Sequence, residues 1–277
     1  MPTEAGCRHG PALVAACVAL AATCAPIAAR YDDVAAAHGL SRDEIPGAPF
    51  RHAVYRPPGQ RSGALLHIYI EGDGTPELRP GLPSADPTPR RPLLPPLMAR
   101  DPAPVVLLGR PCYHGLATTP PCQPEDWTRR RYSDAVVASM AAAARHLVAR
   151  GEHDGAVLIG HSGGGVLAVL LAERLPSVRA VVALASVIDL DRWSRHHGLA
   201  PLDGSLAPIE SAPGHVLRPE LFLAGAEDRV SPPSLIVAAT ARRPNSRVVT
   251  RAGFDHACCW AEAWPEVLAW VDSVTTP

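Results

Sequence analysis

Residues 156–165 read AVLIGHSGGG, and this stretch decides the fold. The apolar residues 156–159 predict a short buried strand, and the apolar run over residues 166–175 predicts a helix. The glycines around Ser162 complete the pattern G-x-S-x-G between them. A serine on a sharp turn from strand to helix projects its hydroxyl group, and flanking glycines relieve the crowding. Ser162 is therefore the candidate nucleophile.

The rest of the chain alternates apolar runs with helical stretches, which predicts an α/β fold. We expect a mostly parallel central sheet with helices on both faces and short lid-like insertions. Further strands are predicted at residues 65–70, 105–108, 179–184, 221–224 and 247–249. Ser133 caps a predicted helix over residues 134–150, and the last helix is predicted over residues 263–274. Two long connections, residues 75–104 and 189–219, follow strand ends and are expected to shape the substrate pocket.

The composition excludes several classes of function. The chain has 277 residues, is 47% hydrophobic and carries a net charge of −1, so it can bury one full core and presents no nucleic-acid surface. Lysine is absent, which excludes a Walker A phosphate loop. Neither an HExxH nor a C-x-x-C motif occurs, so no metal is expected. Residues 163–168 satisfy the dinucleotide pattern G-x-G-x-x-A, but the serine site explains the same glycines better, and no cofactor is expected.

The N-terminal segment predicts export. Residues 11–29 are uncharged and mostly apolar, with Arg8 before them and Arg30 after them. Cys24 lies where bacterial lipoproteins carry their modified cysteine, so attachment to a membrane through a lipidated Cys24 is an alternative to a cleaved signal. The protein is then periplasmic, secreted or lipid-anchored, and it is cytoplasmic if the segment is not a signal.

Four of the seven cysteines lie after residue 29. Cys112 and Cys122 bracket a proline-rich loop and are predicted to form a disulfide in an oxidising compartment; free thiols in a cytosolic enzyme are the alternative. Cys258 and Cys259 are adjacent, and a bond between neighbours strains the intervening peptide. We expect buried free thiols at these two positions.

The chain resembles the α/β-hydrolases over roughly residues 60–275, and among them exported or lipoprotein members from bacteria. The resemblance rests on the serine turn, on an acid and a histidine that follow it in order, and on a glycine-rich loop before it. It implies a signal over residues 1–29, an N-terminal lead-in over residues 30–59 and an α/β-hydrolase domain over residues 60–277.

In this fold the catalytic triad runs serine, acid, histidine along the chain. Asp228, on the loop after the strand at 221–224, is the expected acid, with Glu227 as the alternative. His256 follows the last strand. It would act as general base toward Ser162, and Asp228 would orient and stabilise its imidazole.

The resemblance also implies an oxyanion hole built from backbone N–H groups. One donor is Gly163, and the other comes from the loop after the strand at 65–70, where Asp73 is the first candidate and Gly74 the second. Glu71 stands where a histidine is usual. A carboxylate at Asp73 would repel a developing oxyanion unless its side chain points away.

Other polar and aromatic residues near the site have simpler interpretations. The run from Arg129 to Arg131 is interpreted as solvated, with a carboxylate or phosphate clamp as the alternative. His161 occupies the variable position of the motif. Trp127 and Trp193 are expected to pack beneath loops, with a substrate-facing role as the alternative.

Together these residues predict a serine hydrolase that acts on a small-molecule acyl substrate, with carboxylic esters as the first expectation. An acyltransferase or peptidase with the same triad is an alternative, as is a non-catalytic binding protein that retains the scaffold.

Overall fold

The computed structural model describes residues 26–60, 62–210 and 218–276. Cys24 and most of the predicted signal lie outside the described residues, so export and lipidation stay predictions. Among the described helices, none is both long enough and apolar enough to cross a membrane.

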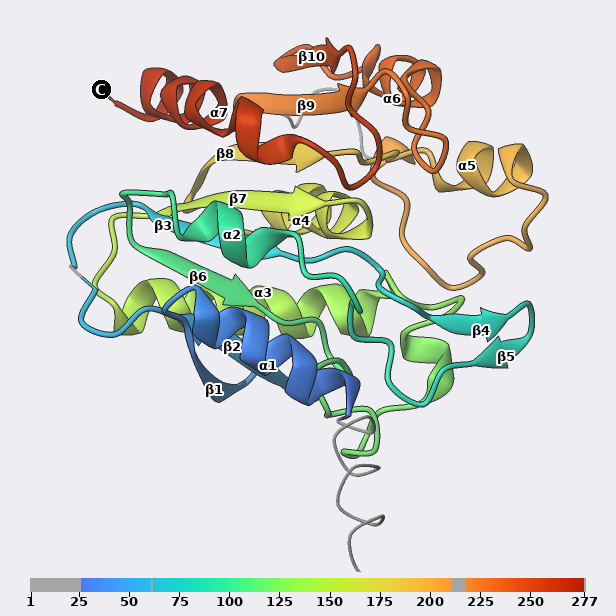
Figure 1. The fold of residues 1–277 in the computed structure, drawn as a ribbon, viewed down its shortest axis with the longest axis horizontal. Coiled ribbons are helices and arrows are strands. Elements are labelled where there is room, and N and C mark those ends of the chain that lie inside the picture. The colour runs from blue at the N-terminus through green and yellow to red at the C-terminus, as the bar shows by residue number, and fades with distance from the viewer. Residues whose placement is uncertain (1–25, 61, 211–217, 277) are drawn as a thin grey trace, which may run out of the picture.

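Eight strands form one twisted sheet, whose spatial order is β1-β2-β6-β3-β7-β8-β9-β10 (Figure 1). Their bounds are β1 Ser41–Pro46, β2 Arg51–Arg56, β3 Leu66–Ile70, β6 Val105–Leu108, β7 Ala156–His161, β8 Val178–Leu184, β9 Glu220–Gly225 and β10 Ser246–Arg251. The pairs β1–β2 and β2–β6 are antiparallel, and every other pair in this sheet is parallel. The parallel strands therefore end at one common edge, where loops can converge.

Helices cover both faces of the sheet. One face carries α3 (Asp134–Arg150), α4 (Gly163–Arg174) and α6 (Pro233–Thr240), and the other carries α1 (Ile27–Ala37), α2 (Leu94–Met98) and α7 (Trp260–Thr275). Figure 1 shows α5 (Leu190–His196) and the small hairpin of β4 (Glu77–Arg79) and β5 (Leu82–Pro83) beyond the carboxyl ends of the parallel strands.

The central strands are mostly apolar on both faces because helices cover both sides of the sheet. In β7, Ala156 and Leu158 pack into one core, whereas Val157 and Ile159 pack into the other. This arrangement explains why the strand appears in the sequence as a continuous apolar run and not as an alternation.

The predicted strands and the helix over residues 134–150 are confirmed, the helix with Ser133 as its N-cap. The lead-in predicted over residues 30–59 instead contributes most of α1 and two strands of the main sheet. Strand β1 escaped prediction because it lies at the edge of the sheet and is largely exposed, with a charged sequence that hides the strand pattern.

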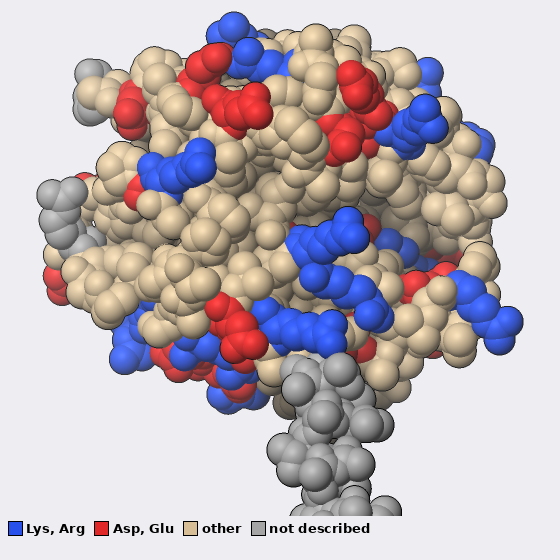
Figure 2. All heavy atoms as spheres, in the orientation of Figure 1, with Lys and Arg blue, Asp and Glu red and all other residues tan. Residues whose placement is uncertain are grey.

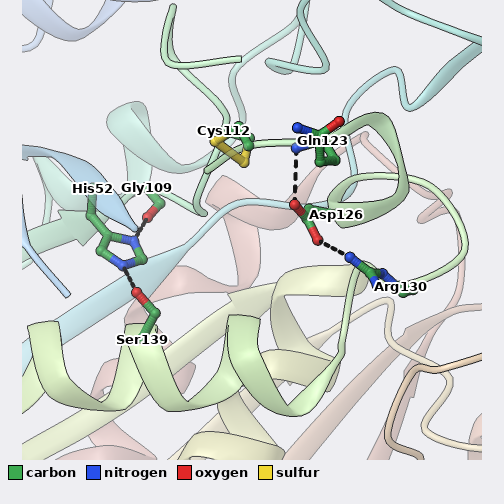
Figure 3. Close-up of a disulfide and its surroundings, with 8 residues drawn as sticks. His52, Gly109, Cys112, Gln123, Asp126, Arg130 and Ser139 are labelled. Atoms are coloured by element: carbon green, nitrogen blue, oxygen red, sulfur yellow. Dashed lines mark hydrogen bonds and ion pairs between the residues drawn. A yellow bond between two sulfur atoms is a disulfide. The ribbon is translucent and has the colours of Figure 1, made fainter. Parts of the chain in front are cut away.

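The predicted disulfide between Cys112 and Cys122 is present, with a Cα–Cα distance of 5.6 Å (Figure 3). Beside it, the Asp126 carboxylate accepts hydrogen bonds of 3.0 Å from the backbone N–H of Gln123 and from the guanidinium of Arg130. The crosslink and these bonds hold the loop between β6 and α3 in shape.

The start of α3 is joined to the sheet by a buried histidine. His52 on β2 lies 2.9 Å from the Gly109 carbonyl oxygen and 2.8 Å from the Ser139 hydroxyl (Figure 3). Burial lowers the pKa of His52 to about 4, so its imidazole is neutral at neutral pH.

The second pair of cysteines differs from expectation. Cys258 and Cys259 are joined by a disulfide, and neither is buried, so the prediction of buried free thiols is wrong. Both lie in the loop that enters α7, where Cys259 has a left-handed backbone with φ of 77°. The loop leaves Cys258 exposed and Cys259 partly buried against the core beside α7.

Candidate active site

Ser162 occupies the turn between β7 and α4. Its backbone is strained, with φ of 53° and ψ of −124°, a combination that non-glycine residues rarely adopt. The turn is so tight that a Cβ atom on Gly160 would lie 2.2 Å from the Gly164 carbonyl oxygen, and one on Gly164 would lie 2.0 Å from the Ile70 carbonyl oxygen. Only glycine fits at these two positions, and the geometry is that of a nucleophile elbow.

An acid and a histidine meet close to this elbow. The Nδ1 atom of His256 lies 2.9 Å from Oδ2 of Asp228, whose side chain is fully buried. The second carboxylate oxygen of Asp228 accepts hydrogen bonds of 2.8 Å from the amides of Val230 and Ser231. One oxygen thus fixes the turn and the other orients the imidazole. Glu227 is exposed, and its side chain does not contribute to this pair.

His161 connects the elbow to the histidine loop. Its Nε2 atom lies 2.8 Å from the carbonyl oxygen of His256, and the two rings lie 4.9 Å apart. Burial, with a smaller contribution from His256, lowers the pKa of His161 to about 4. The neutral ring donates its Nε2 proton to the carbonyl oxygen. Sequence reasoning missed this role, because nothing in the motif shows that a loop 95 residues away returns to it.

The structure brings Ser162 and the Asp228–His256 pair to the same end of the sheet. Within the described part of the chain, however, no hydrogen bond joins the Ser162 hydroxyl directly to His256. Such bonds are often long before a substrate binds and shorten in the reacting complex.

The glycine-rich loop after β3 lies against the serine. A Cβ atom on Gly72 would come within 3.1 Å of the Ser162 Cβ atom. Gly74 has φ of 64°, and a Cβ atom there would lie 2.1 Å from the Pro87 carbonyl oxygen, so this position also requires glycine. Of the predicted oxyanion residues, Asp73 and Gly163 line one cavity together with Ser162, and Gly74 follows Asp73 on the loop.

The Asp73 carboxylate is neutralised by two arginines. Arg110 donates to one of its oxygens, and Arg131 donates to the other at 2.8 Å. The Tyr132 hydroxyl lies 2.8 and 2.9 Å from the same two oxygens. Burial alone would raise the pKa of Asp73, but the positive charges of Arg131 and Arg110 outweigh it and lower the pKa well below its usual range. Two arginines against one carboxylate leave this cluster with a net charge of +1, and one Asp73 oxygen lies beside Gly163, where a Cβ atom would meet it at 2.0 Å.

This cluster changes the interpretation of the arginine run. Arg131 is buried, so the prediction of a solvated run is wrong for it, and the carboxylate that it clamps belongs to its own chain. Arg129 is exposed, as predicted. Arg110 and Tyr132 were missed altogether, because they lie 37 and 59 residues from Asp73 and no local pattern connects them.

Glu71 connects the same loop to two helices. Its buried carboxylate accepts hydrogen bonds of 3.1 Å from the Tyr31 hydroxyl and from the amides of Leu93 and Leu94. Burial raises its pKa. In place of the usual histidine, this chain has a residue that ties the loop to α1 and α2.

A small cavity adjoins the serine. Its volume is about 20 Å³, and Ser162, Gly163, Asp73 and Tyr132 line one side of it. The predicted pocket-forming connection at residues 189–219 supplies the opposite wall, through Leu190, Trp193 and Leu202. Residues 75–104, the other predicted connection, contribute no side chain to the described lining. Figure 2 shows the surface hollowed on the right, between the α5 segment and the β4–β5 hairpin.

The α5 segment is attached to the acid loop. The indole Nε1 of Trp193 donates a hydrogen bond of 2.7 Å to the Val230 carbonyl oxygen, and Nε2 of His197 lies 2.9 Å from the same atom. Trp193 therefore lines the cavity instead of only packing under a loop, whereas Trp127 is buried as expected.

Comparisons with known proteins agree with this architecture. No protein-family model and no curated protein matches the chain. A puromycin-hydrolysing peptidase from Mycobacterium tuberculosis superposes with a TM-score of 0.60 at 18% identity, over 87% of this chain and 40% of that one. A hyperthermophilic esterase from the archaeon Pyrobaculum calidifontis gives 0.59 at 18% identity, over 91% and 92% of the two chains. Mouse alpha/beta hydrolase domain-containing protein 10 gives 0.59 at 13% identity, over 84% and 97%. The chain has the α/β-hydrolase fold.

In the α/β-hydrolase fold the reactive groups lie at the carboxyl ends of the parallel strands. Here Ser162 follows β7, Asp228 follows β9 and His256 follows β10. The chain spans only about 40% of the length of the puromycin-hydrolysing peptidase, and all three identities are below 25%. These similarities concern the fold and leave the reaction to the site.

Side chains that bind metals are not grouped in the described part of the chain. Across residues 26–60, 62–210 and 218–276, no group of three or more His, Cys, Asp or Glu side chains could hold a metal ion. Residues 163–168, which satisfy a dinucleotide pattern, are buried in the first turns of α4. Gly163 faces the serine cavity there.

Proposed function

We propose that this protein is a serine hydrolase that cleaves carboxylic esters through an acyl-enzyme on Ser162. The observation that carries the proposal is the Asp228–His256 hydrogen bond, on a loop that His161 ties to the elbow of Ser162. The strained backbone of Ser162 is a second, independent support, because a fold maintains such strain where it serves a function.

In the first half of the reaction, Oγ of Ser162 attacks the ester carbonyl carbon while Nε2 of His256 takes the hydroxyl proton. The carbonyl electrons move onto its oxygen and form a tetrahedral intermediate. When this intermediate collapses, the bond to the alcohol oxygen breaks and His256 returns the proton to it. Asp228 keeps the Nδ1 proton in place and stabilises the imidazolium that forms.

In the second half, a water molecule takes the place of the serine hydroxyl. His256 removes a proton from it as the water oxygen attacks the acyl carbon, and returns the proton to Ser162 when the acyl–serine bond breaks. The products are a carboxylic acid and the free enzyme.

The oxyanion of both intermediates would be held by the amide of Gly163 and by the amide of Asp73 or Gly74. The Arg110 and Arg131 contacts support this role, because they hold the Asp73 carboxylate in a cluster with a net positive charge. Removal of one oxyanion donor typically lowers kcat by about 10²–10³-fold.

The test is intact-mass analysis after treatment with a small fluorophosphonate, which phosphonylates activated serines. We expect one adduct on the wild-type protein, located at Ser162 and absent from Ser162→Ala and His256→Ala. The acid is tested with a matched pair of neighbours: Asp228→Asn is expected to slow labelling strongly, whereas Glu227→Gln leaves its rate unchanged. Folded protein that takes up no adduct would instead support a non-catalytic binding protein on the same scaffold.

Export remains part of the proposal. Disulfides persist in oxidising compartments, so the bonded pairs Cys112–Cys122 and Cys258–Cys259 support a periplasmic, secreted or Cys24-anchored protein. Mass analysis of Cys24 in protein purified from membranes tests the lipidated form.

A further inference from the structure

The cavity at Ser162 is too small for an extended acyl chain. The space open to the centre of a water molecule is about 20 Å³, and one water molecule needs about 10–15 Å³ by this measure. The cavity is open to solvent on its remaining side. The apolar part of the wall consists of aliphatic side chains, with Val166, Val187, Leu190 and Leu202 beside Trp193. Space beside the serine is therefore sufficient for a methyl-sized group.

Several of these walls are firmly held. Val166, Val187 and Leu190 are buried in the core that lies against α4. Trp193 is oriented at the cavity by a hydrogen bond of 2.7 Å from its indole to the Val230 carbonyl oxygen. Enlarging the cavity would mean breaking this bond or disturbing a packed core.

The polar side is equally constrained. Tyr132 and Asp73 face the cavity, and both are locked into the cluster with Arg110 and Arg131. Moving either side chain would separate a buried carboxylate from its partners, which is costly. The cavity is thus bounded on one side by packing and on the other by ion pairs.

We infer that this cavity is the acyl subsite and that the enzyme is selective for acetyl esters. The inference rests on the proposed function. The cavity is lined by Ser162, whose oxygen bonds the acyl carbon, and by Gly163 and Asp73, whose amides would flank the carbonyl oxygen. The remaining substituent on that carbon must then enter the cavity. Leu202 and Trp193 set the limit on its length.

The first experiment measures kcat/KM for p-nitrophenyl acetate, butyrate, hexanoate and octanoate, which share one leaving group. We expect acetate to be the best substrate, with a fall of about 10-fold or more at butyrate, because misfit by a methylene or two changes kcat/KM by roughly 10–200-fold. A parallel series of acetate esters with alcohols of increasing length is expected to show a much weaker dependence on length.

The second experiment enlarges the cavity. Leu202→Ala is chosen over Trp193→Ala because Leu202 lines the cavity and its side chain makes no hydrogen bond that the variant would lose. We expect Leu202→Ala to raise the butyrate-to-acetate ratio of kcat/KM by roughly 10-fold. Leu199→Ala is the matched control: Leu199 lies on the same segment, is 47% exposed and does not line the cavity, so the ratio should not change.

Fluorophosphonate labelling of each preparation distinguishes a failure of the acetyl-ester inference from a failure of the proposed hydrolase function. If Ser162 is labelled but longer acyl chains react as fast as acetate, the acetyl inference is overturned and the proposed hydrolase stands. A length limit found only on the alcohol side, or a ratio that Leu202→Ala leaves unchanged, also overturns it. If Ser162 takes no label in folded protein, the proposed function itself fails and the inference fails with it.

Discussion

The imidazole of His161 lies 2.8 Å from the carbonyl oxygen of His256, so the residue before the proposed nucleophile holds the loop of the proposed base. We expect His161→Ala to lower kcat by about 10–100-fold with little change in KM, because a displacement of about 1 Å in a catalytic group can cost 10²-fold. Steady-state kinetics on p-nitrophenyl acetate measure the effect.

The conservative variant separates positioning from general structure. In His161→Gln the side-chain amide nitrogen can occupy the place of Nε2 and donate to the same carbonyl oxygen, so much of the kcat should return. In His161→Asn the amide is too short to do so. If Gln and Asn variants were equally active, the hydrogen bond would have no positioning role.

Removal of one arginine from the Asp73 cluster should destabilise the protein. We expect Arg131→Met to lower the free energy of unfolding by about 2 kcal/mol, because it leaves a partly buried carboxylate with fewer partners. The exposed Arg129 provides the control, and Arg129→Met should stay within about 0.5 kcal/mol of wild type. Urea denaturation measures both; equal effects would show that the cluster contributes nothing specific to stability.

Acid should weaken the fold over a defined range of pH. Burial lowers the pKa of His52 and His161 to about 4 and that of His114 to about 3. The unfolded chain binds protons at these positions below pH 6.5, whereas the folded chain does not, so stability falls as the pH drops from about 6.5 toward 4. At pH 5 each such histidine contributes a loss of about 2 kcal/mol.

The measurement is the difference in unfolding free energy between pH 7.5 and pH 5. His52→Gln removes one of the buried titrating groups and should reduce this difference by about 2 kcal/mol, whatever its effect on stability at neutral pH. His196→Gln, at an exposed position, should leave the difference unchanged. An unaltered difference in His52→Gln would contradict the assignment.

The two disulfides predict a simple chemical signature. Denatured, non-reduced protein should leave Cys112, Cys122, Cys258 and Cys259 unlabelled by iodoacetamide, and prior reduction should expose all four. The double variant Cys112→Ser with Cys122→Ser should lose about 3 kcal/mol of stability, since a loop of this length constrains the unfolded chain by about that amount. Labelling of the non-reduced pair at Cys112 and Cys122 would contradict the crosslink.

The parts of the fold that could be predicted are those with a local signal. The helix α3 matches its predicted bounds because Ser133 and Gly151 mark its ends, and β7 was found because its residues are apolar on both faces. Strand β1 had no such signal, since its charged side chains face solvent at the sheet edge.

The residues of the candidate site likewise divide into those with a local sequence signal and those without one. Ser162, Asp228 and His256 were predicted from a motif and its chain order, and the structure brings the acid and histidine together. The Asp73 cluster could not be predicted, because Arg110 and Tyr132 contact Asp73 only after β3, β6 and α3 have packed. Residues that act through long-range contacts carry no local pattern.

The shared acceptor at Val230 has a consequence for how specificity can diverge. Trp193 and His197 both donate to its carbonyl oxygen, and its amide donates to the Asp228 carboxylate. The α5 segment and the acid loop are therefore joined through one residue, Val230. Replacing the whole segment would remove both hydrogen bonds to this carbonyl oxygen and so disturb the loop that carries Asp228. New substrate ranges are more readily reached, in evolution or by design, through single replacements on the cavity wall.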